Sequence, residues 1–298
     1  MLFRGINAYC CVICSDNRMN MAAKKIDAKL FRAVFQLVSA RPWLEQRDEA
    51  VIEMLNDCET DRQQALVLNL LERFKFSNSS DLGASAKSIA EHITVVWALT
   101  PLTTAIVAIA DRNESDGSHF LLKALAQKFS REDGWSDVNF FGHITSVADL
   151  DVNFTNIVLV DDFIGTGKKI TRKVKWAREI LQAQPIVRRL YICSMAGMNF
   201  SKPLLNGLNI EYFCTTWLSK GIADFYTGEQ LTAAIEDMTA LEKTLKELGS
   251  DYRFGYKKSE AMYYHEPYNV SNNVFPLFWW GKSDQRRFRK ALFSRGAA

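Results

Sequence analysis

One segment, residues 157–171, constrains the fold of this chain more than any other, and its sequence is IVLVDDFIGTGKKIT. Four apolar β-forming residues lead into two adjacent aspartates, and a Gly-Thr-Gly turn then opens a segment with a helical pattern. This order predicts a buried parallel strand, a loop and a helix, with Asp161 and Asp162 at the carboxyl end of the strand. Open α/β sheets bind their ligands at that edge.

The loop narrows the kind of ligand. Gly165 and Gly167 let main-chain N–H groups approach an anion, and the helix that begins near Lys168 directs its positive end to the same place. The two aspartates repel a phosphate, but they are suitable acceptors for two neighbouring hydroxyl groups or for a metal ion. Together these features predict a sugar phosphate as the ligand.

Spacing excludes two commoner phosphate motifs. A Walker A loop needs a glycine where this chain has Asp162, and a serine or threonine where it has Lys169. The dinucleotide-binding fingerprint needs a third glycine at the position of Ile170. Two alternatives stay open: a buried strand whose aspartates cap a helix, and an ATPase strand of Walker B type.

The segment resembles the phosphoribosyl pyrophosphate motif of type I phosphoribosyltransferases, in which two acidic and two mostly apolar residues precede a Thr-Gly turn. The resemblance implies an α/β fold with a five-stranded parallel sheet flanked by helices, and phosphoribosyl pyrophosphate with Mg²⁺ as the ligand. It assigns the ribose hydroxyls to the catalytic pair Asp161 and Asp162, and no metal directly to the protein. It assigns the 5′-phosphate to Gly165, Thr166, Gly167, Lys168 and Lys169.

Two positions depart from that family. Many members have threonine or serine where this chain has Lys169, and purine-salvage members carry an aspartate base at the position of Gly165. The resemblance therefore does not imply an ordinary purine-salvage activity.

A second strand, turn and helix precede the motif. Residues 103–110 form an apolar β-type run, residues 111–118 a polar turn, and residues 120–129 a helical pattern. In the resembled family this turn contacts pyrophosphate, which implies Arg112 and Asn113 as ligands, and Ser118 is placed to cap the helix. An ordinary surface turn is the alternative.

Three further β-type runs, at 139–145, 189–195 and 209–217, complete the five parallel strands. The connection over residues 146–156 is too short for the long mobile lid that active family members place there.

The rest of the chain divides into three parts. Residues 1–21 are expected to be a disordered leader, and its Cys-x-x-Cys pair has no second pair nearby that would indicate zinc. Residues 22–99 are expected to form a helical region, with a capping box at Thr60 and Gln63 and a helix over 84–99. The phosphoribosyltransferase-like core then spans 100–250, and residues 251–298 hold an aromatic and amide-rich segment with a basic tail.

The C-terminal segment offers two candidate sites. Asn272, Asn273 and Trp279 belong to a stretch of amides and aromatics that suits a base or acceptor pocket, although core packing would produce the same pattern. A dense basic run indicates contact with nucleic acid or a solvated tail, and its candidate contacts are Arg286, Arg287, Arg289 and Lys290. The net charge of +3 is too small to decide between them.

The Asn-Asn stretch that leads into Pro-x-Phe-Trp, taken with the aspartate motif, resembles diverged phosphoribosyltransferase-like proteins of bacterial conflict systems, including effectors encoded beside anti-phage retrons. This implies a toxic effector that transfers or cleaves a phosphoribosyl group, with the retron reverse transcriptase and its DNA-RNA product as partners. A catalytically inactive module that senses a nucleotide or ribose phosphate, or that binds nucleic acid, is the alternative. Oligomerisation stays open.

Composition predicts a compact cytoplasmic protein without a membrane partner. Of 298 residues, 48% are hydrophobic and 24% charged, which is enough for a large core and leaves no room for an extended disordered region. No apolar run reaches the roughly 20 residues that span a bilayer.

Overall fold

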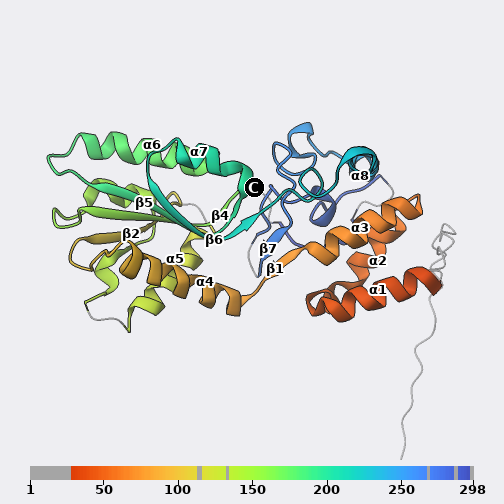
Figure 1. Ribbon diagram of the computed structural model, residues 1–298, viewed down its shortest axis with the longest axis horizontal. Coiled ribbons are helices and arrows are strands. Elements are labelled where there is room, and N and C mark those ends of the chain that lie inside the picture. Colours follow the sequence, from red (N-terminus) through yellow and green to blue (C-terminus); the bar gives the residue numbers. More distant parts are fainter. Residues whose placement is uncertain (1–27, 113–115, 132–133, 267–268, 285–287, 296–298) are drawn as a thin grey trace, which may run out of the picture.

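The computed structural model describes residues 28–295 except 113–115, 132–133, 267–268 and 285–287. The predicted leader and three of the predicted site residues, Asn113, Arg286 and Arg287, lie outside the described residues. The described chain forms two lobes that lie side by side (Figure 1). We call them the sheet lobe, which runs from α4 to β6, and the helical lobe, which contains the remaining elements.

The sheet lobe holds five parallel strands in the order β3-β2-β4-β5-β6, which confirms the predicted sheet. Helices α4 and α5 cover one face and α6 and α7 the other (Figure 1). Its elements are α4 (Ser79–Glu91), β2 (Thr104–Ala108), α5 (Ser118–Phe129), β3 (Phe140–Phe141), β4 (Asn156–Ile164), α6 (Lys168–Gln182), β5 (Arg189–Met198), α7 (Lys202–Asn206) and β6 (Glu211–Leu218).

Strand β4 is the middle strand and its side chains alternate between two cores. Val158 and Val160 pack with the helices α4 and α5, whereas Ile157 and Leu159 pack with α6. Because both faces are covered, the strand is apolar from Ile157 to Val160, and its two carboxylates come near its carboxyl end.

Two predicted elements have different bounds in the structure. The strand expected over 139–145 is only two residues long, because a 3₁₀ helix takes over at Ile144–Asp149. The helix expected over 84–99 begins earlier, at Ser79, where Asn78 closes a capping box, and it gives way to a π-helical turn over His92–Val96. The predicted cap at Thr60 is confirmed, because its hydroxyl accepts a hydrogen bond from the main-chain N–H of Gln63.

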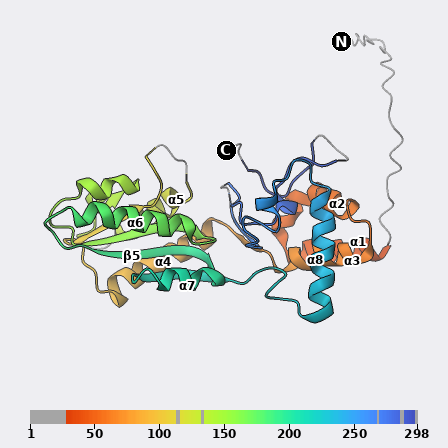
Figure 2. The ribbon, with the colours of Figure 1, turned by 90° about the horizontal axis from the view of Figure 1, so that it is seen from above.

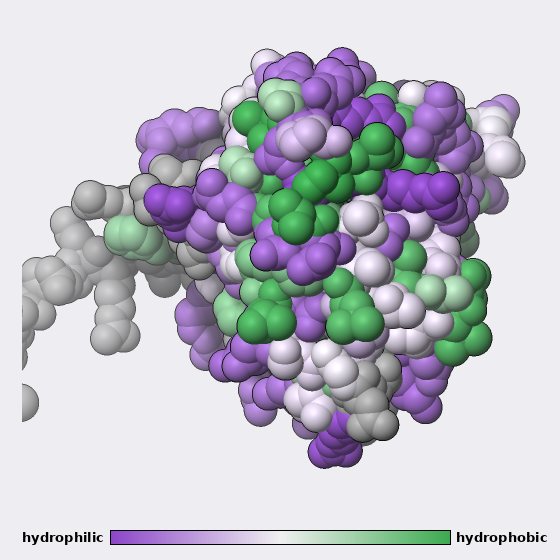
Figure 3. Space-filling view, turned by 90° about the vertical axis from the view of Figure 1, so that its left-hand side faces the viewer, coloured by the Kyte–Doolittle hydropathy of each residue, from purple (hydrophilic) through white to green (hydrophobic). Residues whose placement is uncertain are grey.

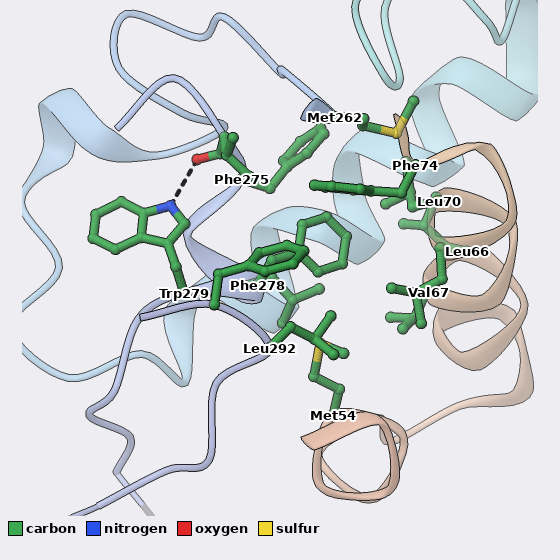
Figure 4. Packing of buried hydrophobic residues seen from close by; sticks show 14 of the residues in the cluster. Met54, Leu66, Val67, Leu70, Phe74, Met262, Phe275, Phe278, Trp279 and Leu292 are labelled. Carbon is green, nitrogen blue, oxygen red and sulfur yellow. Dashed lines mark hydrogen bonds between the residues drawn. The ribbon is translucent and has the colours of Figure 1, made fainter. Parts of the chain in front are cut away.

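The helical lobe joins the two ends of the described chain. Its elements are α1 (Ala28–Ala40), α2 (Asp48–Asn56), α3 (Asp61–Arg73), β1 (Lys75–Ser77), α8 (Gly228–Lys243) and β7 (Tyr263–His265). Strands β1 and β7 pair in parallel, and one hydrophobic cluster unites α2 and α3 with the C-terminal segment (Figure 4). Helix α4, which the sequence grouped with these helices, packs against the sheet instead.

Seen from above, the chain passes between the lobes at two places, from β1 into α4 and from β6 towards α8 (Figure 2). The outer end of the sheet lobe shows apolar residues scattered among polar ones (Figure 3). The exposed side chains of Leu102, Val152 and Val187 lie just ahead of β2, β4 and β5, at the amino ends of these strands. Among the described residues, no helix is both long and apolar enough to cross a membrane.

Candidate functional site

A cavity of about 1010 Å³ lies between the two lobes at the carboxyl end of β4. On one side are Asp116, residues 161–170 and Arg172, which we call the sheet wall. On the other are residues 269–273 with Tyr256 and Arg295, which we call the C-terminal wall. The cavity therefore lies where an open α/β sheet is expected to bind its ligand.

Three carboxylates meet at the base of the sheet wall. Oxygen atoms of Asp116, Asp161 and Asp162 lie within 4.8 Å of one another. Asp161 is buried and accepts a hydrogen bond of 3.1 Å from the main-chain N–H of Asp162. The carboxylate of Asp162 lies against Gly117, where a Cβ atom would collide with it. The predicted acidic pair is thus completed by an aspartate from the turn after β2.

Lys169 supplies the counter-charge of this cluster. Its Nζ atom lies 2.6 Å from Asp116 Oδ2 and 3.3 Å from Asp161 Oδ1, and its side chain is 35% exposed. The sequence had assigned Lys169 to the 5′-phosphate. In the structure its ammonium group instead binds two carboxylates, because the first turn of α6 directs it back towards the strand ends.

Burial and the neighbouring charges shift the pKa values of all four groups. Burial raises the pKa of Asp161 well above its usual value, an effect that Lys169 only partly offsets. Burial and the neighbouring Asp116 likewise raise the pKa of Asp162. For Asp116 burial acts in the same direction, but Lys169 outweighs it and lowers the pKa. Burial lowers the pKa of Lys169, yet the carboxylates of Asp161 and Asp116 raise it overall.

The donor chemistry of the cluster fits Mg²⁺, because carboxylate oxygens are the hard ligands that this ion prefers. Lys169 already contacts two of the three carboxylates, so the cluster carries positive charge of its own. This arrangement fits an ion that is coordinated mainly by oxygen atoms of a bound small molecule and less by the protein.

The loop after β4 brings a helix N-terminus to the cavity. Gly167 adopts a left-handed conformation with φ of 76°, and a Cβ atom there would lie 2.8 Å from Leu204. Helix α6 begins at the next residue, and Thr171 Oγ1 donates a hydrogen bond of 2.8 Å to the carbonyl oxygen of Gly167. The residues assigned to the 5′-phosphate therefore line one side of the cavity at the positive end of α6.

The family model PRTase-CE matches residues 40–295, which is most of the chain. The chain belongs to the PRTase-CE family. It is therefore a phosphoribosyltransferase-like protein, as the motif predicted. Among solved structures, it is similar to orotate phosphoribosyltransferase from Aeropyrum pernix, with 15% identity, a TM-score of 0.28, and coverage of 44% of this chain and 70% of that chain. No curated protein matches the chain.

The sequence indicated two residues of the C-terminal wall of this phosphoribosyltransferase-like protein. Asn272 and Asn273 line the cavity opposite the loop, where the sequence placed a base or acceptor pocket. Tyr256 lines it too and was missed, since it belongs to no recognisable motif. Arg295 also lines it, although the sequence groups this residue with the basic tail. Arg295 donates a hydrogen bond of 2.7 Å to the carbonyl oxygen of Val270, which keeps its charge beside the cavity.

The structure corrects the prediction that Trp279 belongs to that pocket. Its ring is buried in the core of the helical lobe and does not line the cavity. Its indole N–H donates a hydrogen bond of 2.9 Å to the carbonyl oxygen of Val274 (Figure 4). The aromatic stretch around it is core packing, which was the alternative interpretation.

The turn after β2 also differs from expectation. Arg112 is exposed and is not among the residues that line the cavity. Ser118 is the first residue of α5 and not its cap, which is Gly117, and its main-chain N–H donates a hydrogen bond of 3.0 Å to Asp116 Oδ1. At the other end of the turn, Lys173 contacts Asp111 at 2.5 Å. Two lysines on one face of α6 thus hold both ends of this turn.

The structure corrects the prediction that Arg289 of the basic tail contacts nucleic acid. Its side chain is buried, 3.1 Å from the carboxylate of Asp57, and donates to the carbonyl oxygen of Leu277 at 2.8 Å. It is therefore not available to a nucleic-acid phosphate. Lys290 is exposed and pairs with Glu49.

Proposed function

We propose that the protein binds phosphoribosyl pyrophosphate with Mg²⁺ in the cavity between the lobes and transfers or cleaves the phosphoribosyl group. One observation carries this proposal: the acidic pair and the glycine loop that follows it line the same cavity. The aspartates can accept hydrogen bonds from hydroxyl groups, and the loop can bind a phosphate. One sugar phosphate in the cavity would meet both.

In this proposal Asp161 and Asp162 accept hydrogen bonds from the two ribose hydroxyls. The main-chain N–H groups of the loop, the N-terminus of α6 and Lys168 bind the 5′-phosphate. Together they fix the sugar so that its anomeric carbon faces the C-terminal wall, which orients the reacting centre. When bound, Mg²⁺ supplies charge that stabilises the pyrophosphate leaving group.

The C-terminal wall is the proposed acceptor side. It provides amide groups from Asn272 and Asn273 and the charge of Arg295. The bond between the anomeric carbon and pyrophosphate breaks, and pyrophosphate departs with the bonding electron pair. An acceptor held by this wall, or a water molecule, bonds to the carbon and releases its proton to the departing pyrophosphate or to solvent.

Phosphorus NMR tests binding and turnover together. We expect the wild-type protein with Mg²⁺ to convert phosphoribosyl pyrophosphate to free pyrophosphate faster than buffer does. An Asp161→Asn, Asp162→Asn double variant is expected to show only the background rate. Equal rates in the wild type and the variant would overturn the proposed enzyme.

A second candidate is a sensor that binds a nucleotide or ribose phosphate without turnover. Two observations favour it: Lys169 occupies the carboxylate cluster, and Gly165 offers no base at the position where purine-salvage relatives carry one. Binding in a calorimeter without pyrophosphate release would support this candidate.

We further propose a cytoplasmic role as the toxic arm of an anti-phage system of the retron type, with the reverse transcriptase and its DNA-RNA product as partners. The resemblance of the aspartate motif and the Asn-Asn stretch to conflict-system proteins supports this. Expression in bacteria is then expected to be toxic, and the double aspartate variant harmless. If the double variant were as toxic as the wild type, toxicity would not depend on this cavity.

A further inference from the structure

Gly165 is a glycine for reasons of space rather than of conformation. Its backbone lies outside the left-handed region that favours glycine. A Cβ atom at this position would, however, lie less than 3.0 Å from Cγ, Nδ2 and Oδ1 of Asn273. A side chain at residue 165 and the amide of Asn273 would therefore occupy the same volume, although the two residues are far apart in the sequence.

The amide of Asn273 is held firmly in that volume. The main-chain carbonyl oxygen of Asn273 accepts hydrogen bonds from Ala261 N at 3.0 Å and from Ser259 Oγ at 2.8 Å, which fixes the backbone that carries the amide. Its Nδ2 atom donates to Ser271 Oγ at 3.0 Å and to Asn272 Oδ1 at 3.2 Å. The side chain is thus a built part of the C-terminal wall and not a mobile surface group.

One atom of this amide lacks a hydrogen bond. Asn273 Oδ1 is buried and has no hydrogen-bond partner among the described residues. A buried acceptor without a donor costs free energy, and folded proteins retain such atoms rarely. Its position in the wall of the cavity, beside the loop, indicates that a ligand or the rearranged loop supplies the missing N–H or O–H donor.

We propose that Asn273 is a specificity-determining residue of the cavity, whose amide takes the place of the side chain that residue 165 lacks. The inference rests on the proposed phosphoribosyl pyrophosphate site. An amide takes up no proton near neutral pH, so this position recognises a ligand by hydrogen bonding and does not deprotonate it. The ligand that fits this position, such as a molecule that accepts the phosphoribosyl group, carries an N–H or O–H group directed at Asn273.

The shared volume is tested by thermal unfolding. The Gly165→Ala substitution is expected to lower the melting temperature by about 3 °C or more, because the new methyl group overlaps the amide. Adding Asn273→Ala removes the three nearest atoms and is expected to recover most of that loss. Gly142→Ala is the matched control, since nothing lies within 4 Å of a Cβ there. Additive losses in the double variant would overturn the shared volume.

Ligand recognition is tested by the isosteric Asn273→Asp substitution. A carboxylate beside the phosphate loop is expected to weaken the binding of phosphoribosyl pyrophosphate with Mg²⁺ by about tenfold near neutral pH. The affinity is expected to recover as the pH falls and the carboxyl group is protonated. A residue that does not contact the ligand would show neither effect, so affinity equal to that of the wild type at every pH would overturn the inference.

The two outcomes separate this inference from the proposed function. Wild-type protein that binds the ligand, with an unaffected Asn273→Asp variant, rejects the role of Asn273 alone. Wild-type protein that does not bind rejects the proposed function and the recognition role with it, and thermal unfolding then decides only whether the two residues share one volume.

Discussion

The sheet wall of the cavity comes mainly from one stretch of chain, whereas the C-terminal wall is assembled from segments far apart in the sequence. Between Asp161 and Arg172, a strand end, a turn and a first helical turn supply most of the sheet wall. The C-terminal wall depends on the pairing of β7 with β1 and on Arg289, which binds Asp57 at the C-terminal end of α2. The first wall follows from local sequence, and the second exists only once both ends of the chain have packed together.

The largest expected effect is therefore on the anchoring of the C-terminal wall. Arg289→Met leaves the buried carboxylate of Asp57 without this guanidinium group, and we expect the free energy of unfolding to fall by about 3–5 kcal/mol. Denaturant unfolding measures the loss. Lys290→Met, which removes an exposed charge, is the matched control and should change stability by less than about 0.5 kcal/mol. Equal stability of the two variants would mean that the wall is not anchored here.

Lys169→Met tests the sheet wall. It removes the counter-charge of Asp116 and Asp161, and we expect a loss of about 1–2 kcal/mol near neutral pH, less than for a fully buried pair because the lysine is partly exposed. Lys169 lowers the pKa of Asp116 against the effect of burial, so this stabilisation is present above the ordinary aspartate pKa and is lost as the pH falls through the folded pKa.

Unfolding measured across pH checks this second prediction. The difference between the wild type and Lys169→Met should shrink below about pH 4. Lys168→Met is the control, because Lys168 is exposed and its loss should affect ligand binding more than stability. A penalty that is independent of pH would show that Lys169 contributes packing and not charge.

The smallest expected effects distinguish Trp279, which is buried in the core, from Arg295, which belongs to the C-terminal wall. Trp279→Phe loses the hydrogen bond to Val274, and we expect about 1 kcal/mol less stability with ligand affinity within about twofold. Arg295→Met removes a charge from the cavity and should weaken phosphoribosyl pyrophosphate binding by about tenfold. If calorimetry shows the same loss for both variants, the C-terminal wall has been assigned wrongly.

The difference between the walls also explains what the sequence could predict. The aspartate pair, the turn and the order of the strands follow from periodicity and from one motif, which local chain geometry determines. No sequence pattern shows whether a single charged residue is exposed or forms a buried ion pair in the folded protein. Arg289 lies among other basic residues, and only the packing of α2 beside it distinguishes a buried ion pair from a solvated tail.

Lys169 and Asp116 show the same limit inside the site. Both were visible in the sequence, one as a departure from the resembled motif and one as an acid in the turn after β2. That they bind each other depends on the parallel pairing of β2 with β4, which places the turn after β2 next to the start of α6 and which no single segment encodes.

Isothermal titration of phosphoribosyl pyrophosphate with Mg²⁺ tests the central claim most directly, with wild-type protein compared with the Asp161→Asn, Asp162→Asn double variant. Burial raises the pKa of both carboxyl groups, so neutral amides should not impair folding, and the melting temperature of the variant should equal or exceed that of the wild type near neutral pH. We predict binding by the wild type and a loss of about 100-fold or more in the folded variant. Equal affinity, or no binding by folded wild-type protein, would contradict the account.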